Sequence, residues 1–125
     1  MEDIVFGFTK PIRAVIVGGN GGVGQEFLRQ LSQDSNVESI IATYRRSVGK
    51  RYKKVDWIPV DVTDEDSIEE MARVVRERKF QPNVIINCVG ILHTDSFDPE
   101  KTWRHLESTV MHRVFAINAF AVALL

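Results

Sequence analysis

The stretch AVIVGGNGGVGQEF, residues 14–27, decides the fold. Ala14–Val17 is a short, continuously apolar run, which predicts a strand buried on both faces, as in parallel sheets. After the glycines, Gly22–Gln33 carries apolar residues at helical spacing, which predicts a helix. The helical face that we expect to pack on the sheet holds Val23, Phe27, Leu28 and Leu31.

The glycine-rich loop between this strand and this helix predicts a nucleotide site. Phosphates bind at such a loop because bare backbone amides and the positive end of the helix dipole both favour an anion. Two spacings fit, G-x-G-x-x-G through Gly19, Gly21 and Gly24, or G-x-x-x-G-x-G through Gly18, Gly22 and Gly24. A plain glycine turn is the alternative, and the strand–loop–helix context favours the nucleotide. The loop residues that we expect to touch it are Gly18, Asn20, Gly21, Gly22, Val23 and Gly24.

Strand and helix patterns alternate along the rest of the chain. The expected further elements are strands over Val37–Tyr44, Val55–Val60 and Asn83–Cys88, a helix that Thr63 caps, and a last helix over Trp103–Leu125. This alternation predicts an α/β fold, a Rossmann-like doubly wound parallel sheet with strand order 3-2-1-4. Pro59 lies inside the third strand, and proline cannot donate to a strand ladder, so we expect that strand at a sheet edge.

The end of the second strand, ATYRR at residues 42–46, bears on which dinucleotide binds. An NAD site places an acid there to hold the ribose 2′-hydroxyl, but Glu38 is at the other end of this strand. Arg45 and Arg46 instead offer planar donors for a 2′-phosphate, which favours NADP. The alternative is a solvated basic loop. A nucleic-acid site is not expected, because the net charge is −1 and no aromatic residues suited to stacking are interleaved.

The bulk composition is that of one ordinary globular domain. The chain has 125 residues, 44% of them hydrophobic and 26% charged. We expect an N-terminal arm over residues 1–11 and a partial NAD(P)-binding domain over 12–125. Cys88 is the only cysteine, which fits a reducing, cytoplasmic setting. No apolar run is long enough for a membrane span, and the three histidines are too dispersed for a metal site, so neither membrane nor metal is expected.

Four motifs, in order, resemble the short-chain dehydrogenase/reductase family, and most of all its C-factor-like subgroup. They are the loop GGNGGVG, the strand end ATYRR, VDVTD after the third strand, and NCVG at residues 87–90. The further cofactor-binding residues that the resemblance implies are Tyr44, Arg45, Arg46, Asp61, Val62, Asn87, Val89 and Gly90. Val17 stands where the family usually has Thr, and Cys88 and Val89 replace Asn and Ala. In the family, hydrogen bonds from the Thr and the Asn fix the neighbouring loops. In this chain those hydrogen bonds would be absent.

The resemblance also implies a catalytic set of Ser, Tyr-x-x-x-Lys and Asn. Asn118 in the last helix matches the Asn. The residues four after Tyr44 and Tyr52 are Val48 and Asp56, so neither tyrosine begins a Tyr-x-x-x-Lys motif. We therefore expect the cofactor-binding half of an enzyme, truncated after the fourth strand and its following helix and inactive by itself.

The expected function is that of an NADP(H)-dependent oxidoreductase acting on a small carbonyl or alcohol substrate. The alternatives are a non-catalytic dinucleotide-binding or regulatory module and an inert truncated product. The last helix also carries Met111, Phe115 and Phe120 on one side. That side resembles a surface that family members bury between subunits, so a homo-oligomer is expected through this helix.

Overall fold

The computed structural model describes residues 4–5, 8–9, 11–91, 94 and 96–125. Its main sheet has four parallel strands: β3 (Ile12–Val17), β4 (Val37–Tyr44), β5 (Val55–Pro59) and β6 (Val84–Asn87). The helices are α1 (Gly22–Gln33), α2 (Glu65–Glu77), α3 (Ser108–Phe115) and α4 (Ala121–Leu124). A small antiparallel pair, β1 (Ile4–Val5) and β2 (Phe8–Thr9), precedes them.

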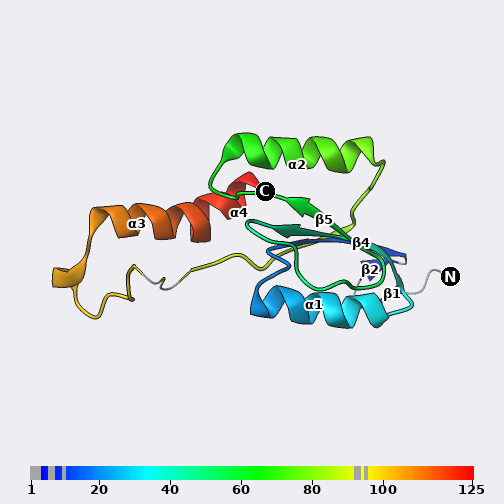
Figure 1. Ribbon diagram of the computed structural model, residues 1–125, viewed down its shortest axis with the longest axis horizontal. Helices are drawn as coiled ribbons and strands as arrows, with labels where there is room; N and C mark the ends of the chain where they lie inside the picture. Colours follow the sequence, from blue (N-terminus) through cyan, green and yellow to red (C-terminus); the bar gives the residue numbers. More distant parts are fainter. Residues whose placement is uncertain (1–3, 6–7, 10, 92–93, 95) are drawn as a thin grey trace.

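The spatial order of the strands is β5-β4-β3-β6, which confirms the predicted order 3-2-1-4. Helix α1 lies on one face of the sheet, and α2 and α4 lie on the other (Figure 1). Pro59 ends the edge strand β5, opposite Tyr44 of β4, so its missing N–H costs the ladder nothing on the outer side. The prediction that the proline strand lies at a sheet edge is therefore confirmed.

The central strand β3 is buried on both faces, as predicted. Its residues alternate between two apolar cores, because successive side chains of a strand point to opposite sides. Ala14 and Ile16 pack with Leu28 under α1, whereas Val15 and Val17 pack with residues of α2 and α4. The strand thus places the carboxyl end of the sheet, and the glycine loop that follows it, on a rigid support.

The buried face of α1 matches the predicted one only in part, since Leu28 is buried and Leu31 packs against the core as expected, but the other two residues do not. Gly24, Leu28 and Ser32 are buried, at spacing of four, while the Val23 side chain is 65% exposed and Phe27 is also exposed. The close approach of Gly24 to the glycine loop turns this side of the helix toward the sheet. Val23 and Phe27 lie one position before that row, so their side chains point to the flank of the helix, where Phe27 borders a hollow with Ile12 and Ala14 of β3.

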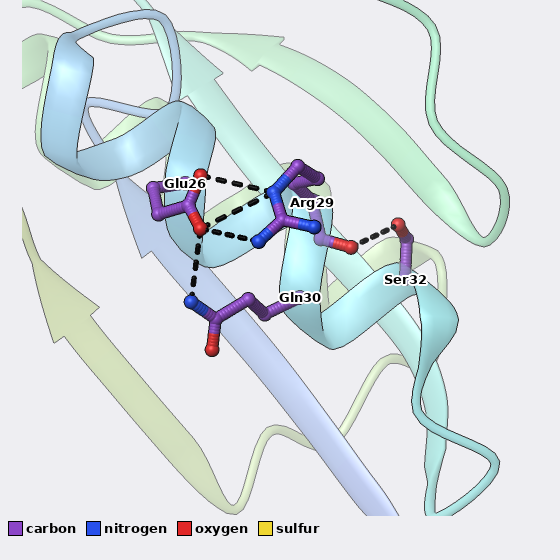
Figure 2. Close-up of polar contacts among 4 residues, drawn as sticks. All are labelled: Glu26, Arg29, Gln30 and Ser32. Atoms are coloured by element: carbon purple, nitrogen blue, oxygen red, sulfur yellow. Dashed lines mark hydrogen bonds and ion pairs between the residues drawn. The ribbon is translucent and has the colours of Figure 1, made fainter.

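The outward side of α1 carries a local polar network (Figure 2). Arg29 Nε donates to Glu26 Oε2 at 3.0 Å, and Gln30 Nε2 donates to Glu26 Oε1 at 3.0 Å. These bonds lower the pKa of Glu26 to about 2, with the Arg29 hydrogen bonds as the main cause. The network links successive turns of the helix, as pairs three or four residues apart do.

The start of α2 differs in detail from the expectation. The helix is capped by Asp64, whose Oδ1 accepts from the Asp66 N–H at 3.0 Å. Thr63 does not cap it, because its hydroxyl donates instead to Asp61 Oδ1 at 2.6 Å. Asp64 is the N-cap because it directly precedes the first helical residue, Glu65, and Thr63 lies one position too early.

The last helix is not the single helix predicted over Trp103–Leu125. A 3-10 turn over Trp103–His105 is followed by extended backbone, and α3 begins only at Ser108. Between α3 and α4, Ala116–Phe120 form a π-helical turn. Single π turns often mark functional positions, and Asn118 lies within this one.

Candidate functional site

A hollow lies at the carboxyl ends of β3 and β4, with a volume of about 400 Å³. It is lined by Gly18, Asn20, Gly21, Thr43, Tyr44, Arg45, Arg46 and Ser47. The structure thus brings together six of the residues expected at the cofactor site, from two separate loops. Thr43 and Ser47 were not foreseen from the sequence. For Thr43 the signal was present, since it is a hydroxyl within an otherwise apolar, buried strand end.

The path of the glycine loop leaves no room for a Cβ at Gly18 or Gly24, and little at Gly19, where a Cβ would lie 2.9 Å from the Ala42 Cβ. Gly18 has φ +80°, in the left-handed region, and a Cβ there would lie 2.6 Å from Val89 Cγ2. A Cβ on Gly24 would lie 2.2 Å from the carbonyl oxygen of Gly18. Both belong to the G-x-x-x-G-x-G spacing. The third glycine of that spacing, Gly22, has nothing within 4 Å of its would-be Cβ and faces open space.

The first turn of α1 has its amides available for an anion. Its N-cap is Gly21, which has no side chain to accept from them, and the first residue to donate back into the helix is Gln25, to the Gly21 carbonyl at 2.8 Å. The amides of residues 22–24 therefore point out of the helix end, beside the open space at Gly22. This cradle fits a pyrophosphate, since bare backbone and helix dipole both favour negative charge there.

Thr43 ties the loop to β4. Its hydroxyl accepts from the Gly18 N–H at 3.0 Å, and its carbonyl accepts from the Gly19 N–H at 2.9 Å. The Thr43 side chain is 1% exposed, so these bonds are shielded from water. They hold the loop although Val17, at the end of β3, carries no hydroxyl.

Asp61 follows β5 and faces basic side chains. Its Oδ1 accepts from the hydroxyl and the backbone N–H of Thr63, at 2.6 and 3.0 Å. These bonds hold the pKa of Asp61 below its usual value, and the charges of Arg45 and Arg113 lower it further. Asp61 is thus a carboxylate at neutral pH. Arg113, on α3, is a member of this charged group that sequence reasoning missed, because only the fold carries α3 to the end of β5.

The segment after β6 closes the other side of the glycine loop. The Cys88 N–H donates to the Val17 carbonyl at 2.8 Å, and the Asn87 side chain accepts from the Val89 N–H at 3.0 Å. These bonds set Val89 against Gly18. Burial raises the pKa of the Cys88 thiol, so it stays protonated and serves as a packed side chain.

Asn118 joins the π turn to the segment after β6. Its Oδ1 accepts from the Ile91 N–H, and its Nδ2 donates to the Ile91 carbonyl, both at 2.7 Å. The side chain is exposed rather than buried, yet both ends of its amide are bonded. A Cβ on Gly90 would lie 3.4 Å from Asn118 Oδ1, so the two expected site residues are in contact distance.

Eight of the expected cofactor-binding residues lie outside the hollow at β3 and β4: Gly22, Val23, Gly24, Asp61, Val62, Asn87, Val89 and Gly90. Gly22 and Val23 line a second, smaller hollow with residues of the outer side of α1. Val62 is buried in the core under α2. In the described part of the chain, no group of three or more His, Cys, Asp or Glu side chains is placed to hold a metal ion. No helix among those residues is long and apolar enough to cross a bilayer.

Comparison with known proteins agrees with this geometry. The family model described as short chain dehydrogenase matches residues 13–125. An uncharacterised oxidoreductase of Saccharomyces cerevisiae is 24% identical over 112 residues, which are 88% of this chain and 34% of the yeast protein. The crystal structure of the carbonyl reductase Sniffer of Caenorhabditis elegans superposes with a TM-score of 0.69 at 25% identity, over 92% of this chain and 50% of that one.

A short-chain dehydrogenase of Leptospira borgpetersenii, solved with bound NAD+, has the same fold, with a TM-score of 0.73 at 21% identity. The match covers 92% of this chain and 43% of the Leptospira chain. The chain therefore spans about a third of the yeast relative and no more than half of the two solved structures. With a family model that covers residues 13–125, this chain belongs to the short-chain dehydrogenase family.

Proposed function

We propose that these 125 residues form the NADP(H)-binding part of an oxidoreductase that acts on a small carbonyl or alcohol substrate. Membership of the short-chain dehydrogenase family supports the oxidoreductase class. The glycine loop, the open first turn of α1 and the hollow at β3 and β4 support a dinucleotide as ligand. The carbonyl or alcohol substrate rests on the resemblance to the family and on the carbonyl reductase among the similar structures.

The observation that carries the choice of NADP is the rim of the hollow. Arg45 and Arg46 are both exposed and both line it, at the end of β4 where the adenosine ribose of a bound dinucleotide lies. Glu38 cannot serve the 2′-hydroxyl, because it lies near the start of β4, with its carboxylate 3.4 Å from the Arg13 guanidinium. Guanidinium groups bind a phosphate through charge-assisted, often bidentate hydrogen bonds.

The other expected site residues have separate roles in binding the dinucleotide. The α1 amides bind the pyrophosphate, and Asp61 and the backbone of Val62 flank the adenine. Asn87, Val89 and Gly90 support the far side of the glycine loop, and Asn118 holds that segment by its two bonds to Ile91. The bound dinucleotide supplies or accepts a hydride. Transfer of the matching proton needs an acid–base group, which in this family's motif is the tyrosine of Tyr-x-x-x-Lys.

A binding module without turnover is the second candidate, and a sequence observation favours it for the chain taken alone. Tyr44 and Tyr52 are followed at the fourth position by Val48 and Asp56, so the 125 residues contain no Tyr-x-x-x-Lys. We infer that the chain by itself binds NADPH without oxidising it in the presence of a carbonyl compound. The absorbance of NADPH over time measures this directly.

We also propose that a second copy of the chain covers the apolar side of α3 and the π turn. Met111, Phe115 and Phe120 are all exposed there, and the two phenylalanine rings lie 6.4 Å apart. Side chains of this kind are enriched in the centre of subunit interfaces.

Titration calorimetry of the full chain with NADPH and with NADH tests the cofactor choice. A charge-assisted hydrogen bond contributes about 1.5–3 kcal/mol, so we expect NADPH to bind about ten- to a hundredfold more tightly. The double variant Arg45→Ala, Arg46→Ala should remove this difference. Arg51→Ala is the matched control, since Arg51 is a basic residue of the same loop outside the lining of the hollow. Equal affinities in the unchanged chain would overturn the NADP assignment.

A further inference from the structure

Asn20 links the glycine loop to the loop that carries the two arginines. Its side-chain Nδ2 donates to the Ser47 carbonyl at 2.9 Å, with the Ser47 hydroxyl at 3.3 Å. Ser47 follows directly after Arg46, and all three residues line the same hollow. One amide side chain therefore spans the two loops across which the hollow is formed.

The orientation of Asn20 is itself set from α1. Gln25 Nε2 donates to the Asn20 backbone carbonyl at 3.0 Å and to its side-chain Oδ1 at 3.2 Å. Because Oδ1 is occupied by a donor, the amide nitrogen of Asn20 is turned toward Ser47. The relay Gln25–Asn20–Ser47 thus runs from the first turn of the helix to the basic loop.

The return of the basic loop is fitted to the same side chain. A Cβ on Gly49 would lie 2.8 Å from Asn20 Oδ1 and 2.9 Å from the Trp57 indole. Gly49 therefore lies close against both the relay and the Trp57 indole. Asn20 thus bonds the segment 45–49 at Ser47 and also lies against it at Gly49.

We propose that Asn20 is a positioning residue that selects for the 2′-phosphate by holding Arg45 and Arg46 at the rim of the hollow. The inference rests on the proposed NADP-binding function. A guanidinium on a free loop must be ordered when the phosphate binds, and that ordering weakens binding. A loop that Asn20 already holds needs less ordering when the phosphate binds. A dinucleotide without the 2′-phosphate does not use the arginines, so the relay affects its binding less than it affects the binding of the phosphorylated form.

Two measurements on the full chain and on Asn20→Ala test this. Hydrogen–deuterium exchange without ligand should be faster in the peptide covering residues 45–49 of the variant. Calorimetry should show the ratio of NADPH to NADH affinity lowered about three- to tenfold, the effect of one or two neutral hydrogen bonds, and any loss of NADH affinity reports contact of Asn20 with the part that the two dinucleotides share. Gly49→Ala, which crowds the loop away from Asn20, should lower the NADPH-to-NADH preference in the same way. Gln30→Ala is the matched control and should change neither measurement, because among the described residues the Gln30 amide bonds only to Glu26 of its own helix.

The outcomes separate the inference from the proposed function. If the unchanged chain prefers NADPH and Asn20→Ala keeps the same preference, the relay does not position the arginines and the inference is overturned, while the NADP assignment stands. Unchanged exchange in residues 45–49 of the variant overturns it as well. If the unchanged chain binds neither dinucleotide, both the proposed function and the inference fail.

Discussion

Gly22 and Gly24 lie two residues apart in the first turn of α1, and a methyl group would meet opposite surroundings at the two positions. At Gly24 it would collide with the backbone carbonyl of Gly18, which no side-chain rotation relieves. At Gly22 it would project into open space. The fold thus requires glycine at position 24. At position 22, under the proposed function, only the ligand requires it.

We expect Gly24→Ala to destabilise the fold by about 3 kcal/mol or more, because the backbone of the glycine loop must move. Gly22→Ala should change the stability by no more than about 0.5 kcal/mol but weaken NADPH binding about tenfold or more, by keeping a phosphate oxygen from one amide. Urea unfolding and calorimetry measure the two effects. If Gly22→Ala binds NADPH as tightly as the unchanged chain does, the pyrophosphate does not bind at the first turn of α1.

Among the elements, those with strong local signals could be predicted residue by residue. The expected helix 22–33 and strand 37–44 have the observed bounds, since glycines, polar breaks and a run of β-branched residues mark them. Pro59 likewise located the sheet edge, because the missing N–H has only one compatible place in a parallel sheet.

The features that depend on contacts between distant segments could not be predicted. The interruption of the last helix at Ala116–Phe120 accompanies the bonds of Asn118 to Ile91, which lies 27 residues earlier. The link from Asn20 to Ser47 likewise spans 27 residues and leaves no periodic trace in the sequence. The glycines and arginines of the candidate site could be identified by motif, but the residues that hold them in place could not.

The ionisation of Glu26 on α1 makes the stability of the protein depend on pH. The folded-state pKa of Glu26 is about 2, below its ordinary value of 4.5, because Arg29 and Gln30 bond its carboxylate. Its contribution to stability is therefore fully present above pH 4.5 and is lost as the pH falls from 4.5 toward 2. The contribution is small, since the pair is exposed to water.

We expect Glu26→Gln to lower the thermal midpoint slightly at pH 7 and to change it much less near pH 2, the folded-state pKa, where most of the contribution of Glu26 is lost. Thermal unfolding followed by circular dichroism at several pH values measures this. Glu65→Gln, an acid in the first turn of α2, serves as the control for loss of a helical surface charge. If Glu26→Gln lowers the thermal midpoint by the same amount at pH 2 as at pH 7, the hydrogen-bonding geometry matters and the charge does not.

At the scale of the whole molecule, two apolar surfaces are open to a second copy. The first is the side of α3 and the π turn that carries Phe115 and Phe120. Helix α3 itself extends away from the sheet (Figure 1). The second is at the edge strand β6, which among the described residues pairs with β3 alone, and where Ile85, on the α2 face of the sheet, is 59% exposed. A strand edge promotes open-ended association, whereas a helix face can close into a symmetric dimer.

We expect sedimentation velocity to show a dimer of the full chain, and the double variant Phe115→Glu, Phe120→Glu to be a monomer. Both side chains are more than half exposed, so the substitutions leave the core intact and should change stability by no more than about 0.5 kcal/mol each. Ile85→Glu is the matched control, a charge on the other apolar surface, and should retain the dimer while reducing larger aggregates. A carboxylate that is buried without a partner in an interface prevents association there. A dimer that survives the double variant and dissociates with Ile85→Glu would therefore assign the interface to β6.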